Sequence, residues 1–307
     1  MRASGFLLVA LLLFGSCGFA VHADEITHGD RMRSFILDVP PGLQTPAPTV
    51  LVLHGGGGTA GRIRRATAMH EAGAREGFVT VYPQGLANQW NDARGSAIVI
   101  EKQGGAGADD VGFLRALVAH LVSNGISDPK RVHVTGLSNG GMMTLRLACE
   151  AADVFAAFVP VIANLPEPAE HDCRPSRPIP MMVMNGTVDR LILWDGGPVA
   201  GMFPGDRGRT LSTSRTMAVF AALNGCAADS LSHVGNSGTD PAVTLTVHRY
   251  SGCNDGVDLR LYAFVGMGHR WPGGNPLPAA FEDLMGPAPR GFPVHDEIWS
   301  FLADKHL

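Results

Sequence analysis

Short apolar runs alternate with longer helix-forming stretches along most of the chain. Runs typical of buried strands occur at 32–39, 50–53, 78–82, 132–135, 155–162 and 181–184, and alternating positions predict two more strands at 243–250 and 257–264. Helical patterns occur at 64–77, 109–123, 142–150, 210–224 and 294–303. Because strands and helices alternate, we expect an α/β fold with a mostly parallel central sheet and helices on both faces. No repeat or linker divides residues 24–307, which we interpret as one domain.

A serine flanked by glycines stands where one of these strands meets a helix. The segment G-L-S-N-G at 136–140 follows the strand at 132–135, which turn-forming residues at 127–129 precede, and leads into the helix at 142–150. Such a turn is so sharp that side chains two residues before and after the serine would collide, and glycine removes them. The first amides of the helix then point towards the serine hydroxyl. We interpret Ser138 as a nucleophile; the alternative is a glycine-rich turn that happens to contain serine.

A serine nucleophile needs a base that accepts its proton and an acid that orients the base. On a sheet with this strand–serine–helix turn, the three occur in the chain order serine, acid, histidine, each at the carboxyl end of a strand. Asp189 follows the strand at 181–184, and His269 follows the strand that ends at residue 264, within a glycine-rich segment. We therefore predict that Asp189 is the acid and His269 the base. The alternative acid is Asp195, in the next turn.

Four consecutive glycines, 55–58, follow the strand at 50–53 and allow backbone amides to converge on an anion. A phosphate-binding loop is the competing interpretation, but no G-K-[ST] follows the glycines. His54, beside this loop, precedes the serine in the chain, so we assign it a structural role. Three other histidines lie on elements without a glycine-rich turn and are interpreted as surface or packing residues: His233, His248 and His295.

Two tryptophans and two aspartates are further candidates. Trp90 and Trp271 could wall a pocket for an acyl or aryl group, or could pack in the core. Asp109 and Asp110 could act together in acid–base chemistry. Their position at the start of a predicted helix favours capping that helix and matching its dipole.

Composition, charge and the N-terminal segment indicate which kinds of partner to expect and in which compartment the protein lies. The chain has 307 residues, a formal net charge of -4 and no basic block, so we expect neither nucleic acid nor an anionic membrane as partner. Residues 1–23 resemble a signal peptide, with Arg2, an apolar stretch at 6–14 and cleavage after Ala23. Cys17 is an alternative lipid attachment site that would anchor a lipoprotein. No later segment is long and apolar enough to span a bilayer. We therefore predict a secreted protein, extracellular or periplasmic.

Export changes how the cysteines are interpreted. Without Cys17 four cysteines remain: Cys149, Cys173, Cys226 and Cys253. Four is an even number in an oxidising compartment, and four cysteines can pair in three ways. Pairing by proximity in the sequence, which we favour, joins the first two and the last two. No C-x-x-C or C-x-x-H spacing is present, so we predict no metal site. The serine chemistry also needs no organic cofactor.

The combination of motifs carries a family resemblance. It includes L-H-G-G-G-G at 53–58, V-Y-P-Q-G at 81–85, D-D-V-G-F-L at 109–114, G-L-S-N-G-G-M-M at 136–143, N-G-T-V-D at 185–189 and G-H-R-W-P-G-G at 268–274. With these the chain resembles the polyhydroxybutyrate depolymerase and feruloyl esterase-like group of secreted α/β-hydrolases, which includes the mycobacterial-type lipoprotein esterases. The resemblance spans nearly all of the chain after the signal peptide.

The resemblance implies an α/β-hydrolase fold and a triad of Ser138, Asp189 and His269. It also implies that the backbone amides of Asn139 and Gly56 hold the oxyanion. We therefore predict a secreted serine hydrolase of carboxylic esters, acting on hydroxyalkanoate oligomers, feruloyl or other aryl esters, or short acyl esters. The alternatives are a serine peptidase on the same fold and a binding protein on a non-catalytic hydrolase scaffold.

Overall fold

The computed structural model describes residues 22–307, except 106, 202–204, 228–229, 236–237, 239–240 and 275–278. Residues 1–21 of the predicted signal peptide, which include Cys17, lie outside the described residues. The first strand begins at His22, so the predicted cleavage after Ala23 falls inside it. Among the described residues, no helix is long and apolar enough to cross a bilayer.

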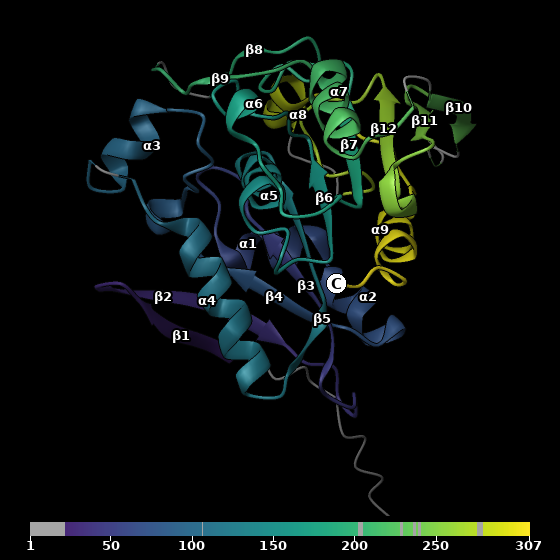
Figure 1. The fold of residues 1–307 in the computed structure, drawn as a ribbon. Helices are drawn as coiled ribbons and strands as arrows, with labels where there is room; N and C mark the ends of the chain where they lie inside the picture. Colours follow the sequence, from purple (N-terminus) through teal and green to yellow (C-terminus); the bar gives the residue numbers. More distant parts are fainter. Residues whose placement is uncertain are drawn as a thin grey trace, which may run out of the picture.

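Within the described residues, ten strands form one twisted sheet (Figure 1). They are β1 (His22–His28), β2 (Arg31–Asp38), β3 (Ala47–Leu53), β4 (Val79–Pro83), β5 (Ser127–Leu137), β6 (Ala157–Val161), β7 (Met181–Gly186), β10 (Ser230–Gly235), β11 (Thr244–Tyr250) and β12 (Leu259–Val265). Two short strands, β8 (Gly197–Pro198) and β9 (Arg209–Thr210), pair separately. The helices are α1 (Ala60–Thr67), α2 (Met69–Glu76), α3 (Ala97–Lys102), α4 (Asp110–Ser123), α5 (Asn139–Glu150), α6 (Ala169–Asp172), α7 (Thr213–Leu223), α8 (Ala279–Met285) and α9 (Val294–Leu302).

The strand order is β1-β2-β4-β3-β5-β6-β7-β12-β11-β10. Neighbours from β4 to β12 pair in parallel, whereas the outer strands at both edges pair antiparallel. The predicted α/β fold with a mostly parallel centre is therefore confirmed. Because the carboxyl ends of parallel strands meet at one edge of a sheet, the loops after β3, β5, β7 and β12 converge there.

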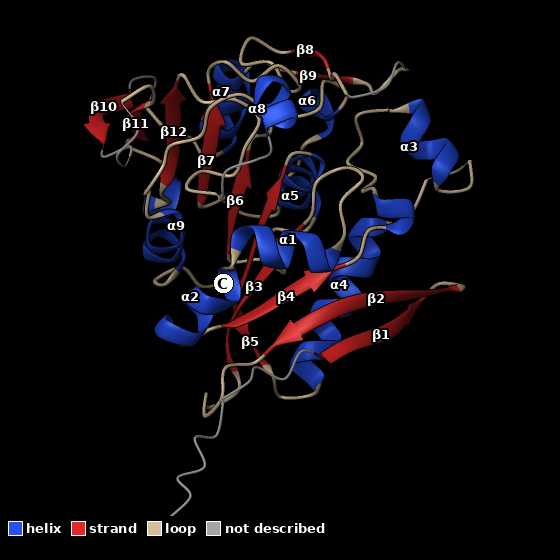
Figure 2. Cartoon of the chain, turned by 180° about the vertical axis from the view of Figure 1, so that it is seen from behind, coloured by secondary structure: helices blue, strands red, loops and turns tan. Residues whose placement is uncertain are grey.

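Helices cover both faces of the sheet, and each face has its own core. Figure 1 shows α4 and α5 in front, while Figure 2, from behind, shows α1, α2 and α9 on the opposite face. One cluster of buried side chains includes Phe113 of α4, Met142 of α5 and Phe220 of α7. The other includes Ile63 of α1 and Phe301 of α9. Packing on both faces explains why the central strands are nearly continuous apolar runs.

Two local predictions differ from the structure. The stretch at 64–77 forms two helices, α1 and α2, separated by Ala68 in the left-handed conformation (φ 48°). The turn expected at 127–129 is instead the first part of β5. There the register against β3 shifts between Ala47 and Thr49, so the residues form an irregular strand start rather than a turn.

The described residues contain two disulfides, Cys149–Cys173 and Cys226–Cys253. These are the pairs expected from proximity in the sequence. The first ties the end of α5 to the segment after α6, and the second ties the end of α7 to the turn before β12. Both lie away from the loops that converge at the carboxyl ends of the parallel strands.

Candidate active site

Ser138 occupies the sharp turn between β5 and α5. Its backbone has φ 58° and ψ -118°, a conformation that non-glycine residues rarely adopt. A Cβ on Gly136 would lie 2.4 Å from the Gly140 carbonyl oxygen, and a Cβ on Gly140 would lie 2.5 Å from the Leu53 oxygen. The two glycines are therefore a steric requirement of the turn. Ser138 itself is half-buried at the surface of a cavity.

Asp189 and His269 are joined at the carboxyl ends of β7 and β12, which are parallel neighbours. The His269 Nδ1 atom lies 2.8 Å from Asp189 Oδ2, and both side chains are almost completely buried. Asp189 Oδ1 also accepts hydrogen bonds from the amides of Leu191 and Ile192, at 2.7 and 2.9 Å. The carboxylate is thus held in one orientation and can accept the proton on Nδ1. That tautomer leaves the other ring nitrogen, Nε2, unprotonated, as a base requires.

A cavity of about 590 Å³ brings Ser138 and His269 to a common surface. Asp195, the alternative acid, is exposed and is not among the described lining residues. The apolar part of the cavity wall comes from several elements and includes Ile63, Leu137, Leu191, Ile192, Val199, Trp271 and Met285. This geometry selects Asp189 over Asp195 as the carboxylate that can orient His269.

The glycine loop at 55–58 lies against the serine turn and lines the same cavity. A Cβ on Gly55 would lie 3.5 Å from Ser138 Cβ, and one on Gly56 would lie 3.6 Å from Asn139 Cβ. The Gly57 amide bonds to the Asn88 oxygen and the Gly58 amide to the Gly55 oxygen, so these two amides hold the loop in shape. Gly56 and Asn139 both remain at the cavity wall, where an oxyanion next to Ser138 could be bound.

His54 fixes the start of this loop. Its Nδ1 atom lies 2.8 Å from the Gly55 oxygen, and the Gly85 amide donates to its Nε2 atom at 2.9 Å. Since Nε2 accepts a hydrogen bond, Nδ1 carries the proton and the ring is neutral. Burial lowers the pKa of His54, which also favours the neutral ring. The contacts agree with the structural role inferred from its position in the chain.

A buried polar network beneath the turn was not predicted. The Asn139 side chain accepts a bond from the Trp90 amide at 2.8 Å and donates to the Trp90 oxygen at 2.9 Å and to Asp92 Oδ2 at 2.6 Å. Burial raises the pKa of Asp92. Asn139, the residue after Ser138, is thus fixed by its side chain and also lines the cavity. The pair Asn91-Asp92 after Trp90 was the available sequence signal, but nothing local indicated its partner.

The prediction that Trp90 walls the substrate pocket is wrong. Its side chain is fully buried, its indole nitrogen donates to the His54 oxygen at 2.8 Å, and it is not among the described lining residues. Packing under the site, the other interpretation, is the one that the structure supports. Trp271 does line the cavity, with 5% of its surface exposed.

Asp109 and Asp110 have structural roles. Asp109 caps α4 by accepting a bond from the Gly112 amide at 2.9 Å. Asp110 is fully buried and forms an ion pair with Arg33 at 2.6 Å. Neither aspartate is among the described residues that line the cavity. The same holds for the three histidines interpreted as surface or packing residues: His233, His248 and His295.

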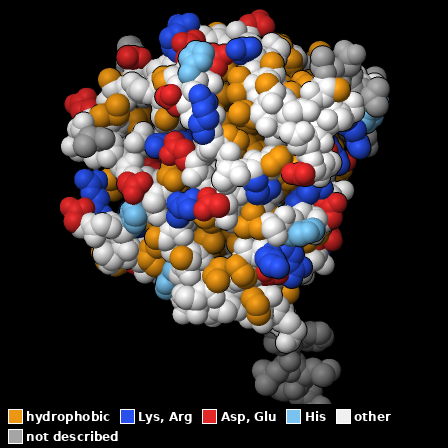
Figure 3. Space-filling view, in the orientation of Figure 1, with side chains coloured by type: hydrophobic (Ala, Val, Ile, Leu, Met, Phe, Trp, Pro, Cys, Tyr) orange, Lys and Arg blue, Asp and Glu red, His pale blue; other side chains and the backbone are white. Residues whose placement is uncertain are grey.

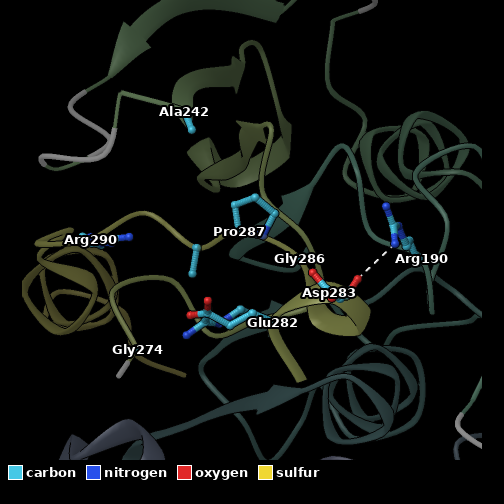
Figure 4. Close-up of a pocket in the computed structure, with 10 residues that line it drawn as sticks. Arg190, Ala242, Gly274, Glu282, Asp283, Gly286, Pro287 and Arg290 are labelled. Carbon is cyan, nitrogen blue, oxygen red and sulfur yellow. Dashed lines mark hydrogen bonds and ion pairs between the residues drawn. The ribbon is translucent and has the colours of Figure 1, made fainter. Parts of the chain in front are cut away.

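A smaller polar cavity of about 450 Å³ adjoins the first and shares Arg270 and Gly274 with it. Figure 4 shows Arg190 pointing towards Asp283, whose backbone oxygen accepts a bond from the guanidinium at 3.0 Å. Arg270 lies 3.6 Å from Glu282 in the same wall. Within the described part of the chain, no group of three or more histidine, cysteine, aspartate or glutamate side chains is arranged to hold a metal ion.

Comparison with known proteins gives a consistent class. The chain matches the family model described as "Esterase PHB depolymerase" over residues 33–164. It is 33% identical over 264 residues to "Putative esterase NocK" of Nocardia uniformis subsp. tsuyamanensis, covering 82% of this chain and 74% of that protein. It is 25% identical over 241 residues to "Feruloyl esterase B" of Piromyces equi, covering 77% of this chain but only 42% of that protein.

Solved structures agree on the fold. The structure named "Acetyl xylan esterase from Aspergillus awamori" superposes with a TM-score of 0.58 and 17% identity, covering 86% of this chain and 99% of that one. At this identity the likeness shows the fold alone. The fold and the relatives together define the chain as a carboxylic ester hydrolase of the α/β-hydrolase fold. It belongs to the polyhydroxybutyrate depolymerase and feruloyl esterase-like family, the group that its motifs resemble.

Proposed function

We propose that the protein is a serine esterase in which Ser138 is the nucleophile, His269 the general base and Asp189 the residue that orients the base. The observation that carries the proposal is the Asp189–His269 pair, 2.8 Å apart, in which His269 lines the same cavity as a serine held at φ 58°. Strained backbone at a cavity surface and a buried acid–base pair are the features that acyl transfer requires.

The reaction proceeds in two halves. His269 Nε2 takes the Ser138 proton as the hydroxyl oxygen attacks the ester carbonyl, and the amides of Asn139 and Gly56 bind the oxyanion. His269 then gives the proton to the leaving alcohol. Water attacks the acyl-enzyme by the same route and releases the acid. Asp189 stays ionised throughout and stabilises the imidazolium.

The cavity volume of about 590 Å³ suits a small or oligomeric ester rather than a large folded partner. Relatives carry the names of feruloyl and acetylxylan esterases and of a poly(3-hydroxyalkanoate) depolymerase, so aryl, acetyl and hydroxyalkanoate esters are the substrate classes to test. Export is part of the proposal: residues 1–23 act as a signal peptide and residues 24–307 form the catalytic domain. Two disulfides fit an oxidising compartment.

The test compares residues 24–307 with their Ser138→Ala variant on 4-nitrophenyl butyrate, methyl ferulate and hydroxybutyrate oligomers. We expect the variant to lose about 10⁴-fold or more in kcat. Asp189→Asn should lower kcat by about as much as replacing the acid of other Ser-His-Asp triads does. Asp195→Asn should keep a kcat near that of the wild type. The proposal fails if Ser138→Ala retains turnover, or if peptide anilides are cleaved as fast as the esters.

A further inference from the structure

The proposed active-site cavity has an unusual charge. None of the described lining residues is Asp or Glu. Five cationic side chains line the cavity: Arg62, Arg94, Lys102, Arg207 and Arg270. The whole chain is acidic, with 28 acidic against 24 basic residues. On the face that Figure 3 shows, acidic and basic side chains are interspersed. The cavity lining is therefore more positively charged than the protein as a whole.

The cations come from segments far apart in the sequence. Arg62 belongs to α1, Arg94 to the loop after β4, and Lys102 to the end of α3. Arg207 precedes β9, and Arg270 follows His269 directly. Since no basic run exists in the sequence, the positive lining arises only when the fold brings these segments together.

Arg94 is the most deeply buried member of the group. Its side chain is 5% exposed, its Nε atom lies 3.5 Å from Asp92 Oδ1, and its Nη1 atom lies 3.5 Å from the Met142 sulfur. Nε makes no hydrogen bond to any described residue. A guanidinium has five N–H donors, and a long ion pair and a sulfur contact leave most of this capacity unused. Arg94 lines the cavity, so a carboxylate there would bind the guanidinium through donors other than the buried Nε.

Asp92 is the ion-pair partner of Arg94, but both of its oxygens accept hydrogen bonds from other groups. Its Oδ2 atom is committed to the Asn139 amide at 2.6 Å and its Oδ1 atom to the Arg94 backbone amide at 3.2 Å. Burial raises the pKa of Asp92. Arg94 thus has one carboxylate partner, at 3.5 Å, while its Nε makes no hydrogen bond to a described residue and no acidic side chain is among the described residues that line the cavity.

Arg62 and Lys102 lie at the exposed rim of the cavity. Within the described part of the chain neither forms an ion pair with a carboxylate, unlike Arg270, which lies 3.6 Å from Glu282. Charges of one sign at the mouth of a cavity attract ligands of the opposite sign. The apolar side chains between rim and base, including Ile63 and Leu191, would contact an aliphatic body.

Resting on the proposed esterase function, we propose that this cavity selects esters that carry a free carboxylate, with Arg94 binding the carboxylate and Arg62 and Lys102 attracting it. A short oligomer of aliphatic hydroxy acids has this chemistry, because one end is a free acid and the body is apolar. Acetyl or feruloyl esters of neutral sugars lack the charge.

The test uses two substrates with a single identical scissile ester: the linear 3-hydroxybutyrate dimer as the free acid, and the same dimer as its primary amide. The readout is the ratio of kcat/KM for acid over amide. We expect a ratio of about ten or more at low ionic strength, falling as salt screens the rim charges. A ratio near one, or a preference for the amide, overturns the proposal.

Substitutions show which residues produce the preference for the free acid over the amide. Arg94→Met should reduce the ratio about tenfold or more, and Arg94→Lys should recover part of it. The double variant Arg62→Gln and Lys102→Gln should lower the ratio a few-fold through KM and flatten its salt dependence. Arg65→Gln, on the same helix but outside the described lining, is the matched control and should keep the wild-type ratio.

Three outcomes separate this proposal from the one on which it rests. If Arg94→Met does not fold, judged by circular dichroism, the double variant decides alone, and an unchanged ratio and salt dependence overturn the proposal. An unchanged ratio in a folded Arg94→Met protein also overturns the assignment to Arg94. Failure of the serine mechanism appears differently, as hydrolysis of 4-nitrophenyl butyrate that survives Ser138→Ala.

Discussion

Replacing His133 with leucine is expected to stabilise the protein, and more so in acid. His133 lies in the centre of β5, is completely buried, and has Val50 and Ala157 as its strand neighbours. Neither ring nitrogen has a hydrogen-bonding partner among the described residues. Burial lowers the pKa of His133 from 6.5 to about 3. Leucine has a similar volume and no polar atoms to leave unpaired.

The magnitude follows from two effects. At about pH 7.5 the imidazole is neutral in both states, and removing an unsatisfied buried polar group should contribute about 1–3 kcal/mol. Between pH 6.5 and about 3 the unfolded chain binds a proton on His133 that the folded chain excludes. The wild type therefore loses about 1.4 kcal/mol per pH unit as the pH falls through this window. At about pH 4.5 the advantage of His133→Leu should be about 2–3 kcal/mol larger than at about pH 7.5.

Urea unfolding at both pH values, followed by circular dichroism, measures this difference directly. His120→Gln, at an exposed position on α4, is the control and should show no pH-dependent gain of this kind. The reasoning is refuted if His133→Leu gives the same advantage at both pH values. A destabilised variant at neutral pH would show that the imidazole packs better than leucine does.

Three further predictions concern the scaffold. Gly140→Ala should abolish ester hydrolysis and lower Tm, because its Cβ would lie 2.5 Å from a backbone oxygen of β3; an active variant would contradict this steric argument. Arg33→Gln leaves Asp110 buried without its partner and should lower the free energy of unfolding by about 3–5 kcal/mol in a urea titration, whereas a loss under 1 kcal/mol would show that the pair contributes little. Replacing Cys149 and Cys173 with serine opens a link across 24 residues and should reduce stability by about 3 kcal/mol, again by urea unfolding; no change would indicate a constrained unfolded state.

The features predicted from sequence are those with local causes. The turn around Ser138 has a recognisable short pattern with glycines where a Cβ would meet the turn itself or the end of β3, and the central strands are apolar because helices cover both faces. Asp189 and His269 were paired because both follow strands that end at the same edge of a parallel sheet. The chain order serine, acid, histidine then predicted which role each of the three residues has.

The features missed depend on tertiary contacts. β1 has the sequence H-A-D-E-I-T-H, which carries no apolar run, and it forms by pairing with β2 at the sheet edge. Ala68 breaks a helical pattern without a glycine or proline to signal it. Trp90 was expected in the pocket because aromatic side chains often line pockets, but its backbone bonds to Asn139 hold it underneath.

Labelling with an alkyl fluorophosphonate tests the central claim most directly. Such a reagent phosphonylates a serine whose proton an adjacent base removes, and peptide mass spectrometry locates the adduct. The account predicts one adduct per chain, on Ser138, formed in step with the loss of ester hydrolysis and greatly slowed in His269→Ala. Hydrolysis that continues when Ser138 is fully labelled, or an adduct on another residue that accompanies the loss of activity, would contradict it.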